Sequence, residues 1–166
     1  MKWVDTHCHL QLIDETLDSE NFHNIEFLII PGVDFESSLK AKEISSEIDL
    51  ESYWSAGLHP HDAKLLNSQE ESLANLFQEA DLIGETGLDF YRNLSTKDEQ
   101  IINFLFHLEY SKQLNKPIII HCRDSFQDTY DQLVEFNNPS SIILHSWTGG
   151  KTVSYTHLTL PTTPVV

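Results

Sequence analysis

The sequence predicts an α/β protein of the TIM (β/α)8 barrel type, with about six of the eight βα units present. The first observation is that short apolar runs recur roughly every 25 to 35 residues, each followed by a longer segment of helical periodicity. Strands alternating with helices indicate a parallel sheet. The second observation is that reactive polar residues follow nearly every apolar run. This favours a barrel over a doubly wound sheet, because barrel enzymes collect their active sites at the carboxyl ends of the strands.

The individual elements follow from this alternation of short and long segments. The expected strands are 2–7, 26–31, 52–57, 81–85, 117–121 and 141–145. The expected helices are 35–48, 68–80, 95–114 and 124–136. A complete barrel has eight units and about 250 residues, so a chain of 166 residues is short by roughly two units.

Helix starts and inward faces can also be read from side chains. Residues able to cap free backbone amides precede three of the helices, namely Asp34 for the first, Asn67 and Ser68 for the second, and Ser95 with Asp98 for the third. Apolar residues at helical spacing predict the faces that pack on the sheet, namely Leu73, Leu76 and Phe77 in the second helix and Ile101, Leu105 and Leu108 in the third.

The character of the chain changes near its end. Residues 152–166 contain five threonines and no acidic residue, lysine or arginine, and they show neither helical nor strand periodicity. We therefore assign residues 1–151 to an incomplete barrel domain and 152–166 to a tail outside it. The segment VSYTHLTLPTT resembles translated vector or adapter sequence, a hypothesis that resequencing of the locus tests.

Composition restricts the class of partner and the compartment. The formal charge of −16 argues against a broad basic face for nucleic acid, although bound divalent cations can reverse the local field in one pocket. Only two cysteines occur, Cys8 and Cys122, which favours a reducing cytoplasm. The longest apolar runs are far too short to span a bilayer, so no membrane partner is expected. No obligate protein partner is evident either.

Two histidines follow the first predicted strand. His7 and His9 are two residues apart, so their imidazoles project from the same face of an extended segment. A lone histidine in a strand is more often structural than a ligand. The pair instead predicts a metal site of the kind that zinc and similar ions occupy.

Three later strands are predicted to end in further metal-binding side chains. Glu85 passes from a buried apolar run into a glycine-punctuated loop, and His121 and His145 each end an apolar run. A capped or salt-bridged Glu85 is as common an outcome as a ligand when the motif is taken alone. Recurrence at equivalent positions favours ligation, because a purely structural barrel would fill such positions with packing residues.

From Trp3 to about Lys151 the sequence resembles the TatD family of metal-dependent deoxyribonucleases. The matching segments are DTHCHL, GLHPHDA, IGETGLDFYR, KPIIIHCRDSF and ILHSWTGG. The resemblance implies hydrolysis of DNA phosphodiester bonds, commonly from the 3′ end of single strands, by water activated between two divalent metal ions (Mg, Mn or Zn). DNA is thus the implied partner.

The resemblance also implies a role for each of these residues. His7 and His9 bind one metal, Glu85 bridges both ions, and His121 and His145 complete the shell of the second. Glu85, His121 and His145 are the implied catalytic residues. A final aspartate from an eighth strand is implied too, and this chain has no matching segment, since Asp5 and Asp89 lie on other strands.

Other residues are predicted to touch substrate. His59 and His61, at the exit of the third strand, could contact a phosphate or support the metal shell, with the two roles weighed evenly. Tyr91, together with Arg92, is placed at the substrate entrance. Arg123 could bind a phosphate oxygen through its guanidinium fork.

Some neighbouring residues have simpler expected roles. Pairing of Arg123 with Asp124 or Asp128 is nearly as common an outcome as phosphate binding. Cys8 and Cys122 adjoin expected ligands but should point the opposite way, into packing.

Two alternative functions remain. Another amidohydrolase-like barrel would also begin with His-x-His, but such enzymes commonly carry a carboxylated lysine where this sequence has Glu85. A truncated metal-binding remnant with an open barrel is the second alternative, because an unclosed parallel sheet exposes unpaired edges.

Overall fold

The computed structural model describes residues 2–13, 22–136 and 141–146. The six strands are β1 (Trp3–Asp5), β2 (Ile25–Pro31), β3 (Ser52–Ala56), β4 (Leu82–Asp89), β5 (Ile118–Arg123) and β6 (Ile142–His145). They form one parallel sheet in the order β1-β2-β3-β4-β5-β6. Sequential parallel order with crossover helices is the arrangement of a barrel wall.

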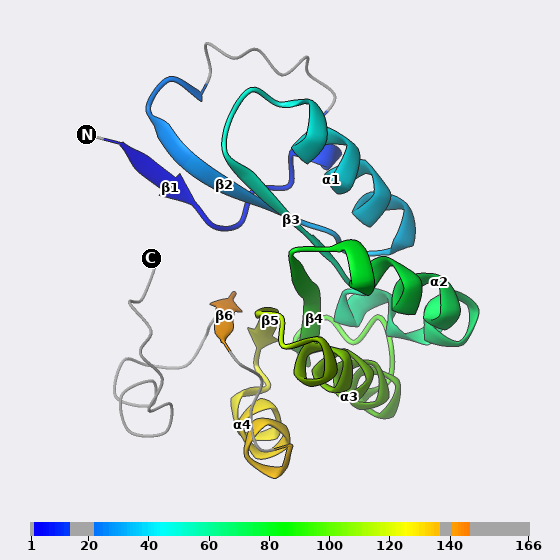
Figure 1. Cartoon of the computed structure of the whole chain (residues 1–166). Coiled ribbons are helices and arrows are strands. Elements are labelled where there is room, and N and C mark those ends of the chain that lie inside the picture. Colours follow the sequence, from blue (N-terminus) through cyan, green and yellow to red (C-terminus); the bar gives the residue numbers. More distant parts are fainter. Residues whose placement is uncertain (1, 14–21, 137–140, 147–166) are drawn as a thin grey trace.

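Helices connect the strands on one side of the sheet. The α-helices are α1 (Phe35–Glu47), α2 (Leu66–Glu79), α3 (Lys97–Leu114) and α4 (Phe126–Glu135), and two 3₁₀ segments are η1 (Leu10–Leu12) and η3 (Pro60–Leu65). Figure 1 shows the strands curling into part of a barrel, with the α-helices along its outer side. The predicted fold class of about six βα units is thereby confirmed.

The core lies between the helices and the sheet. Leu28 and Ile30 of β2, Ile83 of β4 and Ile118 and Ile120 of β5 are almost completely buried. Near-continuous apolar strands are expected where a parallel sheet is covered on both faces. The inward stripe predicted for α2 is confirmed, since all three of its residues are buried.

The inward face predicted for α3 is only partly right. Leu108 is fully buried, whereas Ile101 and Leu105 are partly buried at the margin of the core. The fully buried positions of this helix include polar side chains, among them Gln100 and His107. Apolar spacing missed them because polar residues are buried only where hydrogen bonds compensate, and sequence does not show the partners.

All six strands differ from their predicted bounds, by one or two residues except at the end of β4. β1 ends at Asp5, so His7 lies in the segment after the strand. β4 continues past the predicted end at Glu85 as far as Asp89. Gly84 and Gly87 allow this continuation, because both adopt positive φ, which an L side chain rarely tolerates.

Two of the three predicted helix starts also need correction. Asp34 caps α1 as predicted, accepting a hydrogen bond from the Ser37 amide. Thr96, and not Ser95, caps α3, where it forms a capping box with Glu99. Neither Asn67 nor Ser68 caps α2, because η3 runs directly into that helix.

Two further expectations concern the chain as a whole. In the part of the chain that the structure describes, no helix combines the length and the hydropathy needed to cross a bilayer. The tail assigned to residues 152–166 lies outside the described residues.

Candidate metal centre

Glu85, in the middle of β4, is the centre of a cluster of histidines. Its side chain is 2% exposed, which makes an uncompensated charge costly. The surrounding imidazoles come from four different places in the sheet: His7 and His9 after β1, His59 after β3, His121 in β5 and His145 at the end of β6. The predicted convergence of these strand ends is therefore present.

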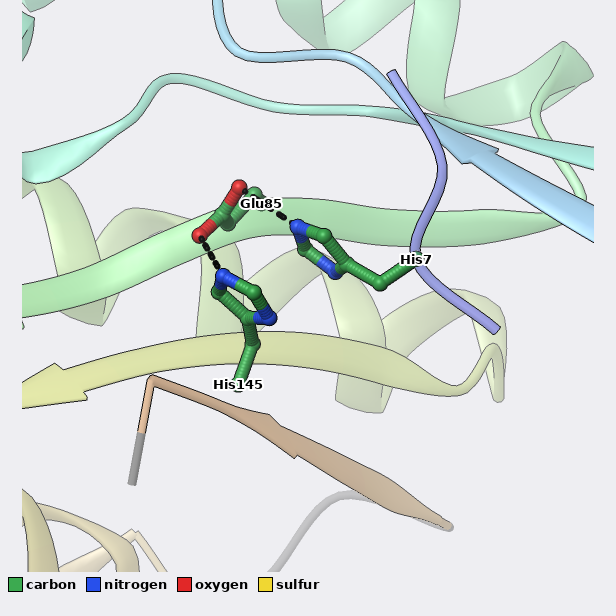
Figure 2. Close-up of side chains that lie close together, drawn as sticks. All are labelled: His7, Glu85 and His145. Atoms are coloured by element: carbon green, nitrogen blue, oxygen red, sulfur yellow. Dashed lines mark ion pairs between the residues drawn. The ribbon is translucent and has the colours of Figure 1, made fainter. Parts of the chain in front are cut away.

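The two oxygens of the Glu85 carboxylate face different histidines. Oε2 lies 3.2 Å from His7 Nε2 and 3.5 Å from His9 Nε2. Oε1 lies 2.9 Å from His121 Nδ1 and 3.9 Å from His145 Nε2. Figure 2 shows His7 and His145 each pointing a ring nitrogen at a different oxygen. This is the division of contacts that a bridging carboxylate makes.

Two groups of side chains have ligand atoms close enough to hold one ion each. One consists of His7, Glu85 and His145, and the other of His59, Glu85 and His121. Glu85 belongs to both groups, in agreement with its expected bridging position. These two groups place His145 with His7 and His59 with His121. The carboxylate oxygens instead separate His7 and His9 from His121 and His145, which is the division that the family resemblance implies.

Glycines bring the Glu85 backbone into contact with its neighbours. A Cβ on Gly84 would lie 2.4 Å from the Ile119 carbonyl oxygen, and one on Gly87 would lie 2.2 Å from that of His121. Only glycine permits this close approach of β4 to β5. The GETG segment therefore sets how near Glu85 comes to His121.

Burial and hydrogen bonding together fix the charge states in the cluster. Burial alone would raise the pKa of Glu85, but hydrogen bonds from His121, His7 and His9 hold this pKa well below its usual value. Burial lowers the pKa of His59 to about 3 and that of His145 to about 4. At neutral pH the ionised carboxylate thus faces neutral imidazoles at His59 and His145, and neutral imidazole is the ligand form that metals require.

The donor set fits divalent cations. His7 Nε2 lies 3.1 Å from His9 Nε2, and His59 Nε2 lies 3.2 Å from His121 Nδ1. Two ring nitrogens so close must share a proton or a cation. Imidazole and carboxylate together suit Zn²⁺ and also accept Mn²⁺ or Mg²⁺. These side chains would hold such an ion at Glu85.

Asp89 forms a second carboxylate centre that sequence reasoning missed. Its Oδ2 lies 2.8 Å from His61 Nε2 and 3.1 Å from His121 Nε2. Its Oδ1 accepts the amide protons of Tyr91 and Arg92. Burial would raise the pKa of Asp89, but the hydrogen bond from His61, aided by Arg92 and His121, lowers it. The signal was the spacing of Glu85 and Asp89, which places both on one face of a continuous strand.

Two of the four predicted substrate residues line a pocket at this cluster. His59 and His61 both line a pocket of about 290 Å³, together with His9, Glu85, His121 and His145. Arg123 and Tyr91 are not among the lining residues; the guanidinium carbon instead lies 4.0 Å from the Tyr91 ring centroid. Tyr91 is 60% exposed.

The two thiols point away from the histidines, as expected. Cys8 Sγ donates to the Ile29 carbonyl, and Cys122 is fully buried. Burial raises the pKa of Cys8 to about 12 and also raises that of Cys122. Both are free thiols in packed surroundings.

Solved structures share this architecture. The crystal structure of YJJV, a TatD homolog from Escherichia coli K12, matches 89% of this chain and 61% of that protein, with a TM-score of 0.74 at 20% identity. A TatD family hydrolase from Entamoeba histolytica gives a TM-score of 0.71 at 18% identity, over 89% of this chain and 59% of its own. The chain thus has the barrel-type fold of these proteins, and it carries a histidine–carboxylate cluster that could hold a metal.

Sequence comparison identifies the family within that class. Residues 4–162 match the family model described as TatD related DNase, and the chain belongs to this family. It is 35% identical over 128 residues to the 3′-5′ ssDNA/RNA exonuclease TatD of Escherichia coli K12, covering 74% of this chain and 48% of the relative. The uncharacterized metal-dependent hydrolase YcfH of the same strain is 31% identical over 141 residues, covering 76% and 51%. The chain thus spans about half the length of these curated relatives.

Proposed function

We propose that this chain acts as a metal-dependent deoxyribonuclease that hydrolyses phosphodiester bonds at the 3′ end of single-stranded DNA. The observation that carries the proposal is the position of Glu85, a buried ionised carboxylate whose two oxygens face separate sets of histidines. Family membership and the exonuclease relatives support the substrate class.

The proposed ligands are His7, His9, Glu85, His121 and His145 around two divalent ions. When bound, such ions act as Lewis acids on phosphate oxygens and lower the pKa of water. An ionised Glu85 and a neutral His145 are the chain's own contribution, since these two side chains need not lose a proton before binding. His59 is an added ligand candidate, because it lies in one of the two groups around Glu85.

Substrate contacts are assigned to side chains at and beside the pocket. His59 and His61 line the pocket, where a phosphate oxygen would lie. Arg123 is proposed to bind a neighbouring phosphate, and the exposed ring of Tyr91 to stack on a terminal base. Contacts of this type do not require a broad basic surface, so the charge of −16 is compatible with the proposal.

A cytoplasmic location is part of the proposal. The two free thiols support it, because reduced cysteines are typical of that compartment.

The test is hydrolysis of a 3′-labelled single-stranded oligonucleotide by the 166-residue chain with Mg²⁺, Mn²⁺ or Zn²⁺. We expect cleavage that a chelator abolishes and that Glu85→Gln removes. Glu71→Gln is the matched control, since Glu71 is an exposed residue of α2, and it should cleave normally. A chain that binds metal yet leaves DNA intact would support the metal-binding remnant and overturn the nuclease proposal for this chain.

A further inference from the structure

Helix α3 buries three polar side chains against the strands that carry the candidate metal centre. Gln100, Asn103 and His107 are all fully buried. Their spacing along the helix places them on one face. Burying polar groups is costly unless each finds hydrogen bonds, so their partners identify what the helix face does.

Gln100 binds both backbone groups of Asp89. Its Oε1 accepts the Asp89 amide proton at 2.8 Å, and its Nε2 donates to the Asp89 carbonyl at 3.1 Å. The same Nε2 donates to the Ser95 carbonyl at 3.0 Å. In a parallel sheet a neighbouring strand makes this pair of contacts, so the carboxamide takes the place of a strand.

Asn103 and His107 bind both backbone groups of Leu58. Asn103 Nδ2 donates to the Leu58 carbonyl at 2.7 Å, and His107 Nε2 accepts the Leu58 amide proton at 3.0 Å. His107 Nδ1 lies 2.8 Å from the Asn103 carbonyl, so it donates there and leaves Nε2 free to accept. The two side chains therefore hold one residue of the segment after β3 from both sides.

The strand pairing explains why these backbone groups need helix partners. The ladder between β3 and β4 pairs Ser55 with Leu82 and Ala56 with Ile83. Leu58 and Asp89 both lie beyond those pairs. Beyond these pairs, side chains of α3 bond the backbone groups of Leu58 and Asp89 in place of hydrogen bonds between β3 and β4.

We propose that Gln100, Asn103 and His107 are positioning residues that set the geometry of the metal centre through the backbone of Leu58 and Asp89. Leu58 directly precedes His59, and the Asp89 carboxylate hydrogen-bonds both His61 and His121. The inference rests on the proposed function for its catalytic consequence only. The effect on the histidine rings is independent of whether DNA is cut.

The first test compares Gln100→Met with Gln113→Met. Both changes replace a carboxamide by an apolar side chain of similar size in the same helix. The Gln113 side chain, however, is exposed, and in the described part of the chain it donates only to Glu109. In metal-free protein, we expect Gln100→Met to shift the ring ¹⁵N resonances of His61 and His121, while Gln113→Met leaves them in place. Metal affinity should fall on the order of tenfold in Gln100→Met alone.

The second test uses His107, so the inference does not depend on one variant that could unfold. His107→Gln keeps an acceptor for the Leu58 amide proton, whereas His107→Leu removes it. We expect the leucine variant to shift the His59 ring resonances and to weaken metal binding, and the glutamine variant to restore most of both. Circular dichroism establishes that each compared variant is folded.

The outcomes separate this inference from the nuclease proposal. Unchanged ring resonances and metal affinity in folded Gln100→Met and His107→Leu overturn the positioning role, whatever the activity on DNA. Equal losses in His107→Leu and His107→Gln also overturn it, because they would indicate a general packing effect. Shifted rings in a chain that never cleaves DNA support positioning and reject the nuclease.

Discussion

The imidazole rings of His7 and His145 stack face to face, with centroids 3.5 Å apart and an interplanar angle of 3°. His7 follows β1 and His145 ends β6, the first and last strands in the order of the described sheet. The curl of the sheet thus brings the carboxyl ends of its two outer strands together beside Glu85.

Loss of His145 should weaken metal binding because it removes one of the three side chains in the group with His7 and Glu85. We expect His145→Ala to lower the affinity for Zn²⁺ or Mn²⁺ by more than about tenfold, as titration calorimetry would measure. His23→Ala, an exposed histidine outside both groups, is the control. Equal affinities of His145→Ala and the parent chain would remove His145 from the ligand set.

Asp89→Asn tests the second carboxylate. The amide keeps the size of the side chain but removes the charge that His61 and His121 face. Loss of a carboxylate behind a metal-binding histidine typically costs ten- to a hundredfold in metal affinity or activity, roughly the effect we expect here. Competition with a chromophoric chelator measures it, with the exposed Asp49→Asn as control. An unaltered affinity would show that Asp89 only caps the turn at Tyr91.

His107 makes the stability of the fold depend on pH. Burial lowers its pKa to about 4 in the folded chain, against an ordinary value near 6.5 in the unfolded chain. Between those two pKa values the unfolded chain binds a proton at His107 and the folded chain does not. The contribution of His107 to the free energy of unfolding is therefore fully present above about pH 6.5. It is lost as the pH falls toward about 4, by about 3 kcal/mol in total.

Urea unfolding of the parent chain and His107→Gln at pH 7 and pH 5 measures this contribution. The free energy of unfolding should drop less in the glutamine variant, because a side chain that does not titrate carries no such linkage. Other groups titrate in both proteins and cancel in the difference. An identical drop in both proteins would contradict the assignment to His107.

Gly87→Ala should destabilise the fold directly. Gly87 has φ +128°, and an added Cβ would lie 2.2 Å from the His121 carbonyl oxygen. Strain and displacement of β5 together should cost about 2 kcal/mol or more in the free energy of unfolding, observed as a lower denaturation midpoint. Asn75→Ala on the exposed side of α2 should leave the midpoint close to that of the parent chain.

Tyr91→Ala tests the stacking role at the substrate entrance. A base stacked on an aromatic ring is worth about 1–3 kcal/mol, so the KM for an oligonucleotide should rise about tenfold while kcat changes little. Tyr53→Ala provides a control at an exposed tyrosine outside the pocket lining. A fall in kcat at constant KM would instead place Tyr91 in the chemical step.

The sequence was sufficient to predict which strands bring the candidate ligands together. Apolar runs ending in His121 and His145 have the period and length of buried parallel strands, and such strands end on one edge of the sheet. The pairing of His7 with His9 followed from alternation along an extended chain. These are properties of short segments, so they can be recognised in the sequence without knowledge of the fold.

The rest depended on contacts between distant segments. The course of β4 beyond Glu85 depends on Gly84 and Gly87, which have positive φ and lie directly against the β5 backbone. No local sequence pattern reveals that contact. The roles of Asp89 and Gln100 depend on partners across the sheet. Their hydrogen bonds compensate burial only in the folded chain, so a polar residue at a core position looked like a solvent-facing one.

Alternation along the chain also separates two kinds of side chain, the histidines at the centre and the cysteines beside them. Cys8 lies between His7 and His9, and Cys122 follows His121, yet both sulfurs face packed surroundings with pKa values raised by burial. The nucleophilic, easily oxidised form of cysteine is the thiolate, and at these positions it is suppressed. Thiol-reactive electrophiles and mild oxidants should therefore spare the centre, and thiophilic ions such as Cd²⁺ would meet only nitrogen and oxygen donors there.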